Sequence, residues 1–126
     1  VDDQTAADPF IKTVLKNAIP ANVGLGVFTA EKAAARLVKG FKADDRVIIL
    51  VKYPKTVWQM MELGAKFEKL NIGGMGAAKG REKFYKNISM SDEERDILKK
   101  IIGAGCKVEI QIIAEDTPVD VAKLLE

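Results

Sequence analysis

The hydrophobic residues of this chain follow helical spacing in some segments and form short unbroken runs in others. Apolar side chains three and four positions apart predict helices, and capping residues, prolines and glycines mark where those helices begin and end. We expect helices in the following places: after Asp8 up to Pro20, after Thr29 up to Gly40, from Pro54 to Gly64, after Ser91 up to Gly103, and a short final one starting at Thr117-Pro118. Ser91 and Glu94 have the spacing of a capping box.

The unbroken apolar runs predict strands. They lie at Val23–Phe28, Arg46–Val51 and Leu70–Ile72, with a short extended piece between Phe84 and Met90 and a last strand at Lys107–Ile113. The consecutive apolar residues from Val47 to Val51 are typical of a central strand covered on both faces. The last run alternates polar and apolar residues, which favours a strand near a sheet edge. Val1, Asp2 and Asp3 read as the end of a strand and the loop after it.

Helices and strands therefore alternate along the chain, which predicts an α/β fold. We expect an open, mostly parallel sheet with helices on both faces. Such a unit normally begins with a strand, and here only a strand's end precedes the first helix. We expect residues 1–126 to form a single domain that is N-terminally incomplete, with the first strand or strands missing from this chain.

The composition removes several classes of chemistry. The 126 residues contain no histidine and one cysteine, and the formal net charge is +2. A Ser-His-Asp triad or a Cys-His pair is therefore impossible, and a zinc site is disfavoured. We predict no cofactor and no metal. The near-neutral charge does not indicate nucleic acid, and no apolar run is long enough to span a bilayer. The acidic start does not resemble a secretory signal, and the lone Cys106 fits a reducing compartment.

Candidate binding groups follow the predicted strands, because ligands of open α/β sheets bind at the carboxyl ends of strands. One group is Asp2 and Asp3, and a second is Lys52 and Lys55. The third is a glycine-rich loop in which the backbone N–H groups of Gly73 and Gly74 can approach an anion closely. Weaker candidates in the same loop are Gly76, Lys79 and Arg81. The spacing matches neither a P-loop nor G-x-G-x-x-G. A flexible turn between strands is the alternative.

Charge is distributed unevenly along the chain. From Lys52 to Lys86 there are eight basic and three acidic residues, whereas residues 109–126 contain five acidic residues and one basic residue. This asymmetry indicates either a docking face for an acidic partner or a phosphorylated group, or an ordinary solvated surface. Cys106 has no basic neighbour that would activate a thiolate, so we expect a small buried residue rather than a nucleophile.

Several segments together resemble one family, over essentially the whole chain. They are Val1-Asp2-Asp3 before a helix, Leu70-Asn71-Ile72-Gly73-Gly74-Met75, the stretch from Lys86 to Glu94, and Gly105-Cys106-Lys107-Val108 leading to Thr117-Pro118. They resemble the enzyme IIB component of the mannose/fructose/sorbose class of the bacterial sugar phosphotransferase system. The Asn71–Met75 segment followed by Lys86–Glu94 is the most specific part of the match.

The resemblance implies a cytoplasmic phosphocarrier, an enzyme by class, that associates peripherally with membrane components. The phosphoryl group arrives from a phosphohistidine on the IIA component and leaves to a hexose-class sugar held by the IIC and IID components. The carrier in this family is a histidine in the first βα loop, which we expect upstream of Val1. By the same resemblance Gly73, Gly74 and Met75 lie beside that loop, and self-association is an open option.

Two further interpretations share this fold. The chain can instead be a non-enzymatic α/β module that binds an anion or a partner protein through Gly73–Arg81, or a regulatory relative that lost the carrier histidine. Because the missing first strand would be central in the sheet, we also expect its absence to expose an apolar seam.

Overall fold

The computed structural model describes residue 1 and residues 3–125. The chain divides into two compact units, Val1–Lys66 and Phe67–Glu126. Among the described residues, no helix is both long enough and apolar enough to cross a membrane.

The described residues of the first unit form helices and the segments that join them. They are α1 (Asp3–Ala7), α2 (Pro9–Ala18), α3 (Ala30–Lys39) and α4 (Pro54–Glu62). The predicted caps are confirmed, because Asp8 accepts a hydrogen bond from the amide of Phe10 at 2.9 Å and Thr29 accepts one from Lys32 at 3.3 Å. Gly40 ends α3 with φ +91°, a conformation that glycine adopts without steric penalty.

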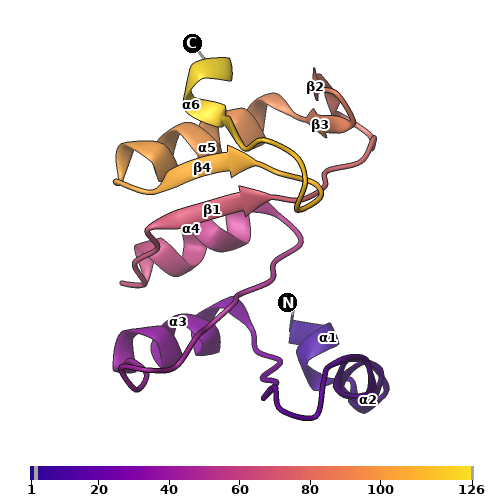
Figure 1. The fold of residues 1–126 in the computed structure, drawn as a ribbon, viewed down its shortest axis with the longest axis vertical. Coiled ribbons are helices and arrows are strands. Elements are labelled where there is room, and N and C mark those ends of the chain that lie inside the picture. Colours follow the sequence, from indigo (N-terminus) through magenta and orange to yellow (C-terminus); the bar gives the residue numbers. More distant parts are fainter. Residues whose placement is uncertain (2, 126) are drawn as a thin grey trace. The chain divides into compact units, whose positions relative to one another are not determined.

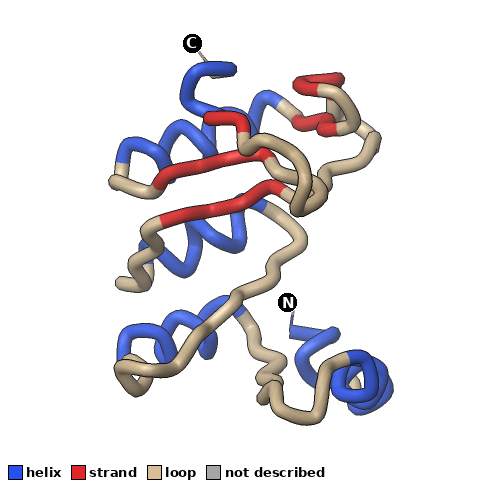
Figure 2. The backbone as a smooth tube through the Cα atoms, viewed as in Figure 1, coloured by secondary structure: helices blue, strands red, loops and turns tan. Residues whose placement is uncertain are grey.

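Three expectations for this unit are wrong or fall outside the structure. Asp3 begins helix α1 and does not lie in a loop, while Asp2 is outside the described residues. The runs 23–28 and 47–51 are not strands, and Figure 2 draws both as loop. A strand exists only through backbone hydrogen bonds to a neighbour, and neither run has such a partner among the described residues. Ile48 and Leu50 are consequently 86% and 87% exposed.

The second unit contains the sheet (Figures 1 and 2). β1 (Lys69–Ile72) pairs in parallel with β4 (Lys107–Ile110), and β4 pairs antiparallel with β5 (Val119–Asp120). β2 (Glu82–Tyr85) and β3 (Ile88–Met90) form a separate hairpin. Two helices complete the unit, α5 (Asp92–Gly103) and α6 (Val121–Leu124). The α/β class is confirmed, although this sheet is mixed rather than mostly parallel.

The last part of the chain corrects two further expectations. β4 is the middle strand of its sheet, not an edge strand, because Val119 and Asp120 add β5 beside it. For the same reason the final helix begins at Val121 rather than at Thr117-Pro118, with the Asp120 carboxylate accepting a hydrogen bond from the amide of Ala122 at 3.1 Å.

The core of this unit forms where α5 and α6 pack against β4 (Figure 1). Helix α5 begins at the predicted capping box of Ser91 and Glu94. The apolar face of α5 is buried, as the helical spacing of its apolar residues requires. The largest fully buried side chains of this unit are Ile88, Met90, Leu98, Ile101, Val108 and Val121.

Candidate functional site

The glycine-rich loop begins directly at the carboxyl end of β1. Gly73, Gly74 and Gly76 are exposed, and their amides donate no hydrogen bond within the part of the chain that the structure describes. A Cβ added at Gly74 or Gly76 would meet nothing within 4 Å, so open space surrounds the backbone here. Exposed, unpaired amides next to a strand's end are the arrangement that binds anions through the backbone.

The loop is anchored on its inner side by Met75. This side chain is 6% exposed, and its backbone carbonyl accepts a hydrogen bond from the amide of Ser89 at 2.8 Å. The loop is therefore tied to β3 at its centre while the flanking glycines remain open to solvent. Met75, which the sequence singled out only through the family resemblance, acts here as the residue that holds the loop in place.

Arg81 closes the other end of the loop. Its Nε and Nη2 atoms donate to the two carboxylate oxygens of Glu94 at 2.8 and 2.9 Å, and its Nη1 donates to the carbonyl of Gly76 at 2.9 Å. Glu94 in turn accepts from the amide of Ser91 at 3.1 Å, which completes the capping box. A guanidinium held in this planar fork positions the loop against the start of α5.

This ion pair changes the acidity of Glu94. Burial by itself would raise the pKa of this carboxyl, but the hydrogen bonds and charge of Arg81, with those of Ser91, outweigh it and hold the pKa below its ordinary value. Arg81 and Glu94 both have side chains that are 14% exposed. Among the basic candidates of the loop, Lys79 remains an exposed, solvated cation.

The other candidate residues lie in the first unit. Lys52 is exposed at the bend before α4, and Lys55 is exposed in the first turn of that helix. Asp3 is the first residue of α1, and Asp2 lies outside the described residues. The structure therefore brings together the candidates of the glycine loop within one unit, and it places the lysine pair at the start of one helix of the other unit.

One charged cluster escaped the sequence analysis. Glu109 in β4 forms ion pairs with Lys69 of β1 at 2.8 Å and with Lys107 at 3.1 Å. These hydrogen bonds, that from Lys69 foremost, hold the pKa of Glu109 below its ordinary value. Lys107 and Glu109 lie two positions apart in β4 and therefore share one face of the sheet, and Lys69 is the register partner of Lys107 in β1. The alternation of side chains along the strands could therefore have revealed the cluster.

Cys106 matches its expected role as a small buried residue. It is 2% exposed, and burial raises the pKa of its thiol. A thiol that resists ionisation is a poor nucleophile.

The sequence of this chain matches a known protein family. The family model described as the PTS system sorbose subfamily IIB component matches residues 1–126. The sorbose-specific EIIB component of Klebsiella pneumoniae is 27% identical over 120 residues, which cover 95% of this chain and 73% of that protein. The mannose-specific EIIAB component of Escherichia coli K12 is 26% identical over 125 residues, which are 99% of this chain but only 39% of that longer protein.

Solved structures agree with the sequence comparison. The crystal structure of the IIBSor domain of the sorbose permease from Klebsiella pneumoniae superposes with a TM-score of 0.87 at 26% identity, covering 98% of this chain and 76% of that one. The crystal structure of manxB from Thermoanaerobacter tengcongensis gives a TM-score of 0.85 at 25% identity, covering 98% of this chain and 75% of that one. The chain belongs to the sorbose-subfamily IIB components of the sugar phosphotransferase system, a family of phosphotransferase subunits.

Proposed function

We propose that this chain is the main part of a single cytoplasmic IIB domain that relays a phosphoryl group during sugar uptake. The group comes from a phosphohistidine of a IIA component and passes to a sugar held by membrane IIC and IID components, with which the domain associates peripherally. The mannose-specific relative is named as an EIIAB component, which is consistent with a IIA partner. The single observation that carries the proposal is the match of the family model across residues 1–126.

The acceptor in this proposal is a histidine that precedes Val1. Residues 1–126 contain no histidine, so no phosphohistidine can form within them. In the first step, the bond between phosphorus and the IIA imidazole breaks as a bond to the IIB imidazole forms. In the second step, a sugar hydroxyl replaces that imidazole and releases its proton. Little covalent work falls to the protein, so positioning and charge stabilisation dominate.

Within this chain, we propose that the glycine loop binds the transferred phosphoryl group. The open amides of Gly73 and Gly74 supply backbone donors, and the anchors at Met75 and Arg81 hold those donors still. Lys52 and Lys55, with Asp2 and Asp3, remain candidates for charge stabilisation and orientation.

The test is phosphoryl transfer to the full gene product from a phosphorylated IIA component. We expect an acid-labile phosphate on that protein, as a phosphohistidine gives, and no label on a protein consisting of residues 1–126 alone. Absence of label on the full product would overturn the phosphocarrier role and favour a non-enzymatic anion- or partner-binding module.

A pair of glycine variants tests the loop separately. Gly74→Ala meets no atom within 4 Å, so the fold tolerates the methyl group, but the group obstructs close approach of an anion to the backbone. We expect at least a tenfold slower transfer with unchanged thermal stability. Gly103→Ala, equally free of contacts but at the end of α5, is the matched control and should transfer at the normal rate. Equal rates for both variants would remove the loop from the proposal.

A further inference from the structure

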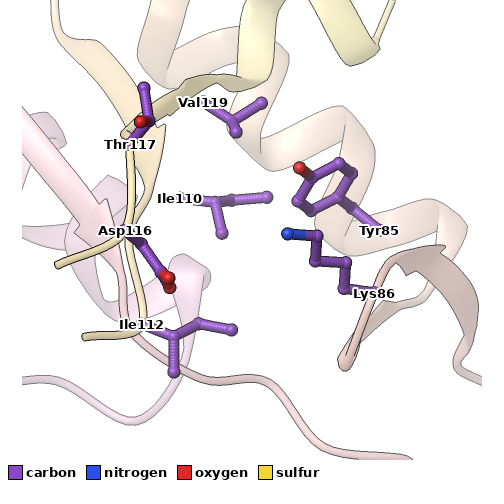
Figure 3. A pocket seen from close by; sticks show the side chains of 7 residues that line it. All are labelled: Tyr85, Lys86, Ile110, Ile112, Asp116, Thr117 and Val119. Carbon is purple, nitrogen blue, oxygen red and sulfur yellow. The ribbon is translucent and has the colours of Figure 1, made fainter.

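A cavity of about 260 Å³ lies in the second unit, apart from the glycine loop. Figure 3 shows Tyr85 and Lys86 reaching into it from one side, with Asp116 and Thr117 on the other and Ile110 between them. The remaining lining residues are Ile112 and Val119. The cavity opens beyond the end of β4, where Ile110 is the last residue of the strand.

Lys86 has an unusual backbone for a residue with a side chain. Tyr85 and Ile88 are paired, so Lys86 and Asn87 form a two-residue hairpin loop. Lys86 has φ +47°, and it is the one non-glycine residue with positive φ in the part of the chain that the structure describes. A hairpin turn with positive φ only at its first central residue normally has glycine there, because a Cβ at that position is sterically strained.

The strain is explained if the lysine side chain is needed. A strained backbone conformation persists where a side chain has a function that a relaxed residue would not perform. The ammonium of Lys86 lies 5.5 Å from the centre of the Tyr85 ring and points into the cavity (Figure 3). Opposite it, Asp116 is held in place because its carboxylate accepts a hydrogen bond from the amide of Ile113 at 3.4 Å.

The lining also indicates what kind of ligand fits. One cation faces one carboxylate, so a dianion such as phosphate would meet repulsion from Asp116 as well as attraction from Lys86. The hydroxyls of Tyr85 and Thr117 add neutral donors and acceptors, and three aliphatic side chains add an apolar surface. Small-ligand sites usually have volumes of roughly 300–1,000 Å³. This cavity, at about 260 Å³, is slightly smaller and has room for one small ring.

We propose that this cavity binds a monosaccharide. The ring hydroxyls bind Asp116, Lys86 and Thr117, while the apolar face of the ring lies against Tyr85 and the aliphatic floor. An amino acid would engage the two charges but leave both hydroxyls unused, so the polyhydroxylated ring fits the lining better. This inference does not rest on the phosphocarrier role, since binding requires no phosphoryl group.

The test is a titration of the full-length protein with D-mannose and L-sorbose, followed by amide chemical shifts. We expect saturable shifts at Tyr85, Lys86 and Thr117 with a dissociation constant in the millimolar range. Glycine and inorganic phosphate serve as comparison probes. The proposal is overturned if neither sugar shifts these amides, or if glycine or phosphate shifts them at lower concentration than the sugars do.

The decisive variant is Lys86→Gly. It relieves the strained turn and removes the ammonium, so we expect the melting temperature to rise while sugar affinity falls at least tenfold. A gain in stability excludes misfolding as the cause of lost binding. Asp116→Asn keeps the volume and should also weaken binding, whereas Lys99→Ala, an exposed lysine on α5, should change neither property. Unchanged affinity in Lys86→Gly would contradict the assignment.

Discussion

The two units of this chain contain similar apolar patterns, yet they bury them to different degrees. Exposed large hydrophobic residues are concentrated in residues 1–66, where they include Phe10, Val14, Val23, Ile48 and Leu50, whereas residues 67–126 contribute only Ile112 and Ile113 among the described residues. The difference lies in pairing: β1 and β4 form a ladder, whereas the runs 23–28 and 47–51 pair with no strand among the residues that the structure describes. An apolar run therefore becomes a buried strand only where a neighbour satisfies its backbone.

The largest expected effect is a contrast in amide hydrogen exchange. In a protein consisting of residues 1–126, we expect β4 and α5 to open with free energies approaching that of global unfolding, about 5 kcal/mol or more, and residues 47–51 to exchange with opening free energies near zero. Residue-resolved exchange on the same sample measures both. Comparable protection of residues 47–51 and Lys107–Ile110 would break the comparison between the units.

Side-chain truncation should show the same contrast. Leu98→Ala removes a side chain that is 0% exposed and should lower the free energy of unfolding by about 2–5 kcal/mol. In a protein consisting of residues 1–126, Leu50→Ala removes an exposed side chain of the same type and should change the free energy of unfolding by less than about 0.5 kcal/mol. Urea denaturation of both variants provides the comparison. A similar loss in each would mean that Leu50 is covered in the folded protein.

The smallest of these effects concerns the Arg81–Glu94 ion pair. Because the folded-state pKa of Glu94 is lowered, the pair stabilises the protein above the carboxyl's unfolded pKa, and that contribution is lost as pH falls through the folded pKa. Glu94→Gln should therefore lower stability by about 1–2 kcal/mol near neutral pH, and the deficit should shrink in acid.

Glu93→Gln is the matched control, since Glu93 is exposed in the same helical turn. Its stability should follow the wild-type pH profile in denaturant titrations. A Glu94→Gln deficit of constant size from neutral to acidic pH would show that the ion pair is not its source.

Local signals predicted helices α2 to α5 and their limits, but they missed α1 and placed the start of the last helix too early. Asp8, Thr29 and Ser91 cap the helices that follow them, and Gly40 ends α3, because capping depends on residues only a few positions apart. The glycine loop was also located correctly after β1. Its anchors were not, because Met75 meets Ser89 and Arg81 meets Glu94 across distances in sequence that no periodicity reveals.

By itself, then, the sequence determined helices α2 to α5, the capping box, the α/β class and the family to which the chain belongs, since these depend on local propensity and on motif identity. The tertiary structure alone decided which apolar runs become strands, that β4 lies in the middle of its sheet, and that Glu109 is held between two lysines. It also decided that Lys86 and Asp116 line one cavity. The physical reason is that ladders, ion pairs and cavities join residues that are distant in the chain, and pairing energy exists only once the fold has brought them together.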